Sequence, residues 1–152
     1  MNPFMKRAIE EAITGVNNND GGPFGAVIVQ NDTIIAAEHN QVLKTHDPSA
    51  HAEVMAIRVA TEQLQTPHLS DCVLYTTCEP CPMCLGAIYW ARIPTIYYGC
   101  TNQDAGSLGF IDEYMHDIFS IQPNDRHQLI QTDHTDCLTV FEHWKKTKRD
   151  LY

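Results

Sequence analysis

The segment CEPCPMC at residues 78–84 constrains this chain more than any other feature, because it spaces three cysteines three residues apart. A ferredoxin-type iron–sulfur motif would need a fourth cysteine three residues further on, followed by proline. Residues 85–87 are Leu-Gly-Ala instead, and the next cysteine is Cys100. The segment therefore does not fit an iron–sulfur cluster, and a metal bound by two of its cysteines needs ligands from elsewhere in the chain.

The segment His51-Ala52-Glu53 is the best source of a further ligand. His51 lies at the start of one predicted helix, and Cys81 and Cys84 lie at the start of another. Cysteines at positions i and i+3 share a helix face, and a helix N-terminus favours the thiolate that binds metal. One histidine and two cysteines leave the fourth tetrahedral position of Zn²⁺ open for water, which is typical of catalytic zinc.

Cys78 precedes Pro80 at the end of a predicted strand, so we interpret it as a small buried residue. As a fourth ligand it would close the site, and the chain would then be a zinc-stabilised binding module without turnover. In that alternative, Cys78→Ser would release the metal.

Glu53 could be a fourth ligand, a surface charge or a base beside the water at the metal. Two thiolates neutralise the charge of Zn²⁺, so they acidify that water less than neutral ligands would. A nearby carboxylate that takes the proton is then chemically useful. Together, His51-Ala52-Glu53 and Pro80-Cys81-Pro82-Met83-Cys84 form the H-x-E and P-C-x-x-C signature of nucleobase deaminases.

The pattern of apolar residues predicts a layered α/β sheet in one domain, because helix and strand alternate in the middle of the chain. Asn2-Pro3 is typical of a helix start. The polar residues after Thr101 predict a loop with Gly106 and Gly109. The predicted elements are a helix over 4–16, a hairpin of 24–29 and 34–37, a helix over 50–64, a strand over 72–77, a helix over 81–91, a strand over 96–99, a short helix near 113–119, a strand near 128–131 and a helix over 138–148.

Composition narrows the classes of function. The chain has 152 residues and a net charge of −9, which disfavours a nucleic-acid partner. One basic run, Lys145, Lys146, Lys148 and Arg149, is best interpreted as a solvated helix face. No apolar run approaches the roughly 20 residues of a membrane span. We therefore expect a cytoplasmic protein with reduced cysteines and no membrane partner.

Three longer segments carry a resemblance to a known family: PFGAVIV at 23–29, HDPSAHAEVMAI at 46–57 and CEPCPMCLGAIYWARI at 78–93. They resemble the cytidine-deaminase-like superfamily and, within it, the bacterial guanine deaminases. The resemblance implies an α/β fold of three α/β/α layers with a mixed five-stranded sheet. It also implies a homodimer of single-domain subunits, residues 1–152, which can exchange a C-terminal segment of about residues 125–152.

The resemblance also implies the roles of the metal-site residues and of a first set of pocket residues. The zinc ligands, for one Zn²⁺ per subunit, map onto His51, Cys81 and Cys84, and the proton shuttle maps onto Glu53. The pocket asparagine maps onto Asn40. The aromatic pocket positions map onto Phe24 and Trp90, where a purine could stack.

Further contacts are expected at helix starts and in the C-terminal third. The backbone N–H groups of Ala52 and Cys81 can steady the substrate or its developing charge. In GFID at 109–112, Asp112 matches an acidic residue that approaches guanine and suits its ring N–H and amino donors. Asp136 and Tyr152 are the nearest matches to a C-terminal acid and a terminal tyrosine.

We therefore expect hydrolysis of guanine, a small purine base, to xanthine and ammonia. The main alternative is a tRNA adenosine deaminase, because those enzymes share H-D-P-x-A-H-A-E and P-C-x-M-C with this chain. The acidic composition favours a small free base over tRNA. A cytosine deaminase, with a smaller pocket, is the third option.

Overall fold

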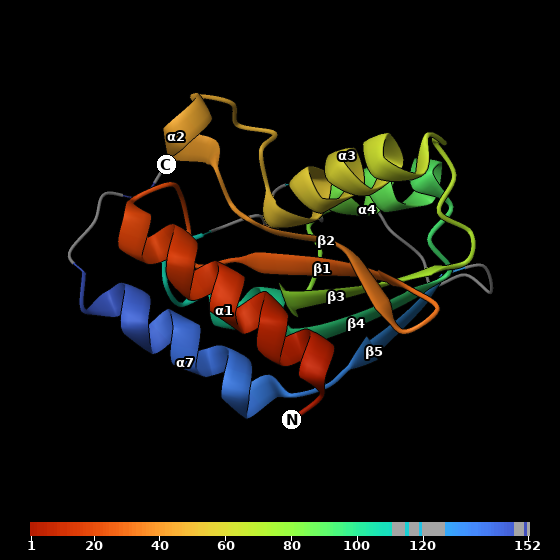
Figure 1. Ribbon diagram of the computed structural model, residues 1–152. Helices are drawn as coiled ribbons and strands as arrows, with labels where there is room; N and C mark the ends of the chain where they lie inside the picture. Colours follow the sequence, from red (N-terminus) through yellow and green to blue (C-terminus); the bar gives the residue numbers. More distant parts are fainter. Residues whose placement is uncertain (111–114, 116–118, 120–126, 148–150, 152) are drawn as a thin grey trace.

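A mixed five-stranded sheet forms the centre of the computed structural model, which describes residues 1–110, 115, 119, 127–147 and 151 (Figure 1). The strand order is β2-β1-β3-β4-β5. Strand β1 is antiparallel to β2 and β3, whereas β3, β4 and β5 are parallel to one another. The strands are β1 (Gly25–Gln30), β2 (Thr33–His39), β3 (Cys72–Cys78), β4 (Thr95–Cys100) and β5 (Gln128–Gln131).

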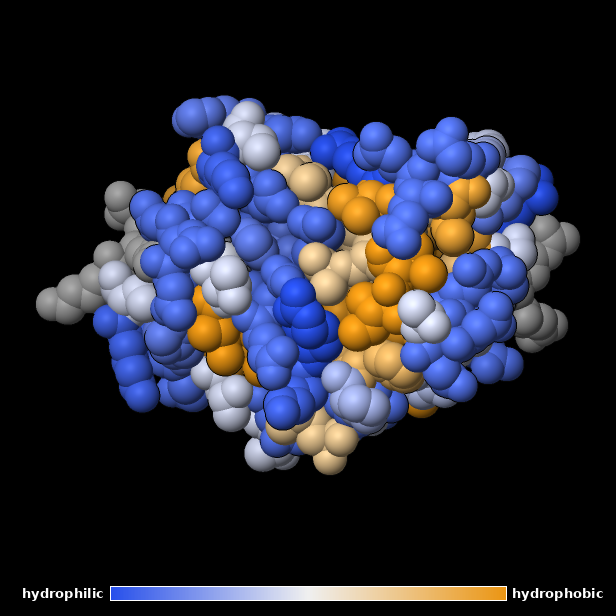
Figure 2. All heavy atoms as spheres, viewed as in Figure 1, coloured by the Kyte–Doolittle hydropathy of each residue, from blue (hydrophilic) through white to orange (hydrophobic). Residues whose placement is uncertain are grey.

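Helices cover both faces of the sheet, which confirms the predicted three layers (Figure 1). Helices α1 (Pro3–Asn18) and α7 (His134–Lys145) pack on one face, and α3 (Ala52–Leu64) and α4 (Pro82–Ala91) on the other. Hydrophilic residues cover α1 and α7, and hydrophobic residues gather beside them over the hairpin strands (Figure 2). Among the described residues, no helix has the length and apolar character that crossing a membrane requires.

Local sequence explains the first elements. The Asn2 side chain accepts hydrogen bonds from the N–H groups of Phe4 and Met5, and Pro3 opens α1, where its missing N–H costs nothing. The predicted hairpin is present. Its turn residues Asn31 and Asp32 have φ values of 49° and 57°, which matches the twist of a two-residue hairpin turn.

Two short helices were not predicted, the second of them in the predicted loop after Thr101, and the last helix is displaced. Helix α2 (Val42–Thr45) and helix α5 (Asn102–Gly106) were not predicted, because four or five residues are too few to show a helical period. A capping box between Thr101 and Asp104 starts α5. Helix α7 begins at His134, four residues before the predicted 138. The prediction missed this start because the first turn is polar and shows no apolar period. The helix predicted near 113–119 lies largely outside the described residues.

The strand directions bring four distant segments to one edge of the sheet. Strand β1 begins at this edge, and β2, β3 and β4 end there. Ligands of open α/β sheets bind outside the carboxyl ends of the parallel strands. The residues just before β1 and just after β2, β3 and β4 are therefore the ones expected to line a site.

Candidate active site

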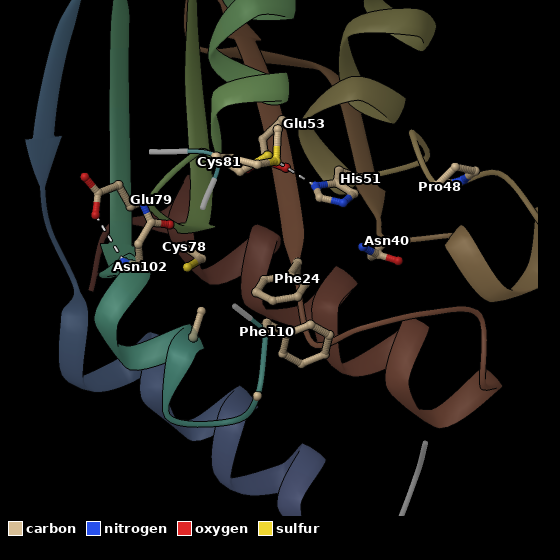
Figure 3. A pocket seen from close by; sticks show the side chains of 13 residues that line it. Phe24, Asn40, Pro48, His51, Glu53, Cys78, Glu79, Cys81, Asn102 and Phe110 are labelled. Atoms are coloured by element: carbon tan, nitrogen blue, oxygen red, sulfur yellow. Dashed lines mark hydrogen bonds between the residues drawn. The ribbon is translucent and has the colours of Figure 1, made fainter. Parts of the chain in front are cut away.

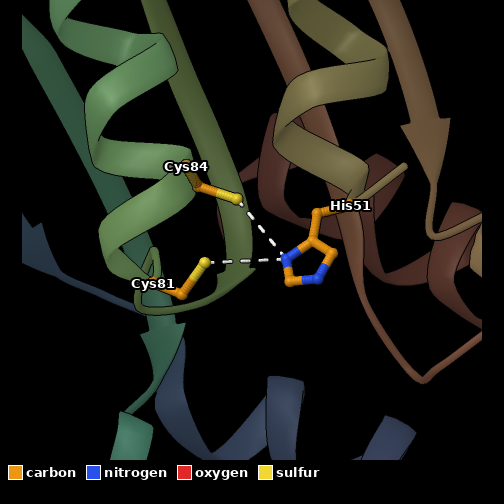
Figure 4. Close-up of side chains that lie close together, drawn as sticks. All are labelled: His51, Cys81 and Cys84. Atoms are coloured by element: carbon orange, nitrogen blue, oxygen red, sulfur yellow. Dashed lines mark hydrogen bonds between the residues drawn. The ribbon is translucent and has the colours of Figure 1, made fainter. Parts of the chain in front are cut away.

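His51, Cys81 and Cys84 meet at the starts of two adjacent helices (Figure 4). His51 is the N-cap residue of α3 and Cys81 is the N-cap residue of α4, and neither side chain caps its own helix. Both side chains are therefore available to each other. The distance from His51 Nδ1 is 3.6 Å to Cys81 Sγ and 3.5 Å to Cys84 Sγ.

These distances fit tetrahedral zinc. With a Zn–N distance of about 2.05 Å and a Zn–S distance of about 2.3 Å, a tetrahedral angle separates nitrogen from sulfur by about 3.6 Å. All three ligand atoms lie within 4.8 Å of one another. Nitrogen and thiolate sulfur are also the ligand types that zinc prefers. His51, Cys81 and Cys84 thus form a candidate zinc site that fits the metal.

The two thiols shift the pKa of each other in opposite directions. A hydrogen bond from Cys84 lowers the pKa of Cys81 to about 4, with a further contribution from His51, although burial opposes it. The same hydrogen bond, together with burial, raises the pKa of Cys84. The lowered pKa of Cys81 favours the thiolate form that binds a metal cation.

Glu53 lies beside the zinc site in the first turn of α3 and is buried. Its Oε1 accepts a hydrogen bond from Thr76 Oγ1 at 3.3 Å, and its Oε2 accepts one from Cys84 Sγ at 3.4 Å. Burial raises the pKa of this carboxyl group, and His51 partly offsets the effect. A carboxyl with a raised pKa carries a proton more readily than an exposed carboxyl does.

Cys78 is buried at the end of β3 and does not join the zinc ligands. Its Sγ donates to the carbonyl oxygen of Thr101 at 3.6 Å, and burial raises its pKa well above the usual range. Cys78 is thus a neutral thiol, and the described residues give the zinc three protein ligands.

A pocket of about 380 Å³ opens in front of the zinc site (Figure 3). His51, Glu53 and Cys81 lie on the side of α3 and α4, and Phe24 and Phe110 lie on the opposite side. The described residues that line the pocket are Phe24, Asn40, Pro48, His51, Glu53, Cys78, Glu79, Cys81, Asn102, Ala105, Gly109, Phe110 and Met115.

Asn40 directs a donor into the pocket. The residue follows β2 and is 1% exposed. Its Oδ1 already accepts hydrogen bonds from the backbone N–H groups of Gly22, at 3.3 Å, and Val42, at 3.1 Å. These contacts fix which end of the amide faces its backbone neighbours. The NH₂ group is then the end that can meet a ligand, and it donates only.

Phe24 and Phe110 form the apolar wall. Phe24 precedes β1, and its ring lies edge-on to that of Phe110 with centroids 5.1 Å apart. A flat heteroaromatic ring can pack against such a wall.

The other predicted residues fall into three groups. The Ala52 N–H belongs to the first turn of α3, next to His51. Trp90 is 78% exposed and packs on Tyr89, and it is not among the described residues that line the pocket. Asp136 lies in the first turn of α7 and also does not line the pocket, whereas Asp112 and Tyr152 lie outside the described residues.

Sequence reasoning missed several pocket residues. Glu79 and Asn102 follow β3 and β4 closely, and the Glu79 carboxylate accepts a hydrogen bond from the Asn102 N–H at 3.1 Å. Their position just beyond two parallel strand ends was the signal that could have identified them. Pro48, Ala105 and Phe110 belong to loops or a short helix, where residue type alone gives no such signal.

Comparison with known proteins agrees with the site. The family described as the cytidine and deoxycytidylate deaminase zinc-binding region matches residues 1–100. Guanine deaminase of Bacillus subtilis is 47% identical over 93% of this chain and 92% of its own. An X-ray structure of guanine deaminase from B. subtilis matches 100% of this chain and 99% of that chain, with a TM-score of 0.75 and 44% identity. The tRNA-specific adenosine deaminase of Aquifex aeolicus is 38% identical over 69% of each chain.

Proposed function

The chain belongs to the family of cytidine and deoxycytidylate deaminases that share this zinc-binding region, and we propose that it hydrolyses guanine to xanthine and ammonia. One observation carries the proposal: a three-ligand zinc site and a buried carboxyl lie at one end of a pocket whose far wall is aromatic. The similarity to a guanine deaminase over nearly the whole of both chains supports this choice of base.

The metal and the Glu53 carboxyl have different roles in the reaction. Zn²⁺ held by His51, Cys81 and Cys84 would supply a Lewis acid that lowers the pKa of water, so that a nucleophile is available at neutral pH. Glu53 takes a proton from the attacking water and returns it to the amino group, which leaves as ammonia. Its burial raises its pKa toward the range in which one group can perform both transfers.

The rest of the pocket holds the base. The Asn40 NH₂ group donates to the carbonyl oxygen of guanine, and the purine ring packs against Phe24 and Phe110. The N–H groups of Ala52 and Cys81 lie at helix starts, where they can steady charge that develops on the base. Asp112, three residues after Gly109 of the pocket wall, accepts from the ring N–H and amino group.

Deamination of adenosine in tRNA is the second candidate, since tRNA-specific adenosine deaminases match 69% of the chain. A polyanionic substrate needs a basic surface around the pocket. Among the described residues that line the pocket there is no lysine or arginine, and two are glutamates. This charge pattern favours a free base over tRNA.

The oligomeric state and the cellular compartment are part of the same proposal. We infer a homodimer that works in cytoplasmic purine breakdown and exchanges its C-terminal segment, about residues 125–152. Support comes from large apolar side chains that remain exposed on α4 and β5, namely Tyr89, Trp90, Leu129 and Ile130. All six cysteines are free, which suits a reducing compartment. Light scattering of the purified chain measures the dimer directly.

The deciding experiment is ammonia release from zinc-loaded protein given guanine, adenine, cytosine or a tRNA anticodon stem-loop. Release with guanine, and formation of xanthine, supports the proposal. Release with the stem-loop and not with guanine refutes it in favour of tRNA editing. Zinc-loaded Glu53→Gln protein serves as the control for contaminating deaminases.

A further inference from the structure

His39, the last residue of β2, is buried between two carboxylates just before the pocket residue Asn40. Its Nδ1 lies 2.9 Å from Glu11 Oε2, and its Nε2 lies 2.8 Å from Asp20 Oδ2. Since an ionised carboxylate only accepts, a ring that satisfies both contacts donates from both nitrogens and is an imidazolium. Neither carboxylate belongs to the zinc site.

The imidazolium joins three parts of the fold. Glu11 lies on α1, Asp20 lies in the loop that follows α1, and His39 ends β2. Both carboxylates also pair with a second cation: Glu11 uses its other oxygen, Oε1, to pair with Arg7, whereas Asp20 Oδ2 lies 3.6 Å from Lys44 Nζ. Asp20 is 7% exposed, so its position depends on these partners more than on water.

The loop held by His39 is the loop that orients the Asn40 amide. Gly22, two residues after Asp20, donates its backbone N–H to Asn40 Oδ1. Gly21 lies so close that a Cβ there would stand 2.1 Å from the same oxygen. The backbone carbonyl of Asp20 also accepts a hydrogen bond from Lys44 N at 2.9 Å. Lys44 lies in α2, two residues after Val42, which is the second donor to Asn40 Oδ1. A shift of the loop therefore moves the contacts that aim the Asn40 NH₂ group.

We propose that His39 is a positioning residue for substrate binding, which holds the Asp20–Gly22 loop and thereby fixes the Asn40 amide with its NH₂ group toward the base. The proposal rests on the proposed function in one respect only, that Asn40 contacts the substrate. It assigns His39, Glu11 and Asp20 a part in base recognition although none of them lines the pocket.

The first test compares guanine kinetics of zinc-loaded wild-type protein with those of His39→Leu and Asp20→Asn. His39→Leu removes both donors, and we expect KM to rise about tenfold while kcat changes less than twofold, because binding is lost equally from ground and transition states. In Asp20→Asn the new amide can donate to a neutral ring, so the link and a near-normal KM are retained. A structural role alone would lower the amount of active protein and leave KM unchanged.

A second variant keeps the proposal testable if His39→Leu fails to fold. Gly15 packs under the His39 ring, and a Cβ there would stand 2.6 Å from His39 Cδ2. Gly15→Ala keeps every polar group and displaces the ring, so we expect it to raise KM as well. His143→Gln is the matched control, because the His143 ring also bonds a side chain of α1, the exposed Asn17, and not the Glu11 or Asp20 carboxylate.

Hydrogen exchange separates this inference from the proposed function. The backbone N–H groups of Gly22 and Val42, both donors to Asn40, should exchange about tenfold faster in His39→Leu than in wild type. If guanine is not deaminated but these two amides exchange faster, the positioning role stands and the choice of base is wrong. If their exchange and KM are unchanged in folded His39→Leu and Gly15→Ala proteins, the positioning role is refuted.

Discussion

The side chains of His51 and Cys81 meet at 3.6 Å although each residue is the N-cap of a different helix, His51 of α3 and Cys81 of α4. N-cap side chains usually bond to their own helix, and these two do not. Both helix starts therefore direct their partial positive charge at the same point, where it favours the thiolates. A metal at this point joins two elements that are separate in the sequence.

Replacing a zinc ligand should be distinguishable from replacing the neighbouring buried thiol. We expect Cys81→Ser to weaken zinc binding by about a hundredfold or more and to abolish turnover, because a tetrahedral site loses one of three protein ligands. Cys78→Ser is the control and should retain zinc, since Cys78 donates to Thr101 instead. Zinc content after dialysis against a chelator measures both. Loss of zinc from Cys78→Ser would mean a closed structural site.

Removing the Glu53 carboxylate should separate metal binding from chemistry. Glu53→Gln keeps the size of the side chain and leaves the three ligands in place, so zinc content should be unchanged. We expect kcat to fall by about 10²–10⁴-fold, the usual contribution of a positioned proton carrier. Glu79→Gln, a second glutamate of the pocket, should retain most activity. Normal turnover by Glu53→Gln would assign proton transfer to another group.

The stability of the protein should depend on pH through His39. The hydrogen bond to Glu11 raises the pKa of His39 above its ordinary value of 6.5, with burial opposing and Asp20 adding to the effect. A raised pKa means that the contribution to the free energy of unfolding is complete below about pH 6.5 and is lost as pH rises through the raised pKa. The charged groups around the ring are Arg7, Glu11, Asp20, Glu38 and Lys44.

Urea unfolding of zinc-loaded protein between pH 6 and 9 measures this dependence. The free energy of unfolding of wild type should fall more steeply with rising pH than that of His39→Gln, which carries no titrating ring. Parallel curves for the two proteins would show that His39 keeps the same charge in the folded and unfolded states.

Asp112 should determine the choice among bases. The two oxygens of a carboxylate can accept from the ring N–H and the amino group of guanine. Asp112→Asn replaces one oxygen by an NH₂ group, which is a donor and would face one of these two donors. We expect kcat/KM for guanine to fall by about 10–100-fold with unchanged zinc content. Equal rates for guanine in variant and wild type would remove Asp112 from the site.

The C-terminal residues should support the pocket wall. The Leu151 side chain lies against Gly109, where a Cβ would stand 2.4 Å from Leu151 Cδ1, and Gly109 lines the pocket. We expect deletion of residues 150–152 to raise KM for guanine severalfold. Lys145→Ala, on the exposed side of α7, is the control for changes near the end of the chain. Wild-type kinetics in the deletion would make the end dispensable.

The zinc site and the sheet could be predicted from the sequence because their signals are local. His51, Glu53, Cys81 and Cys84 lie in two short segments at predicted helix starts, and the structure brings all four together. Trp90 shows the limit of such reasoning. An aromatic residue close to a helix end looks the same in the sequence whether it faces a pocket or solvent, and here it is 78% exposed.

The contacts of His39 that hold the Asp20–Gly22 loop against Asn40 could not be predicted, because they are long-range. His39 and Glu11 are 28 residues apart, and their pairing follows only from how α1 packs on β2. Helix α5 was missed for a different reason: its signal was present in the Thr101 and Asp104 capping pair, but five residues show no hydrophobic period.

The two walls of the pocket pack against different layers of the fold. The metal ligands and Glu53 come from α3 and α4, whereas Phe24 and Phe110 pack against α7 through Phe141 and Trp144. Mutations of Phe110 or of its neighbour Trp144 therefore change the aromatic wall without replacing a residue of the hydrolytic centre. A lineage with this architecture can acquire a new substrate by altering one wall while it inherits its reaction unchanged from the other.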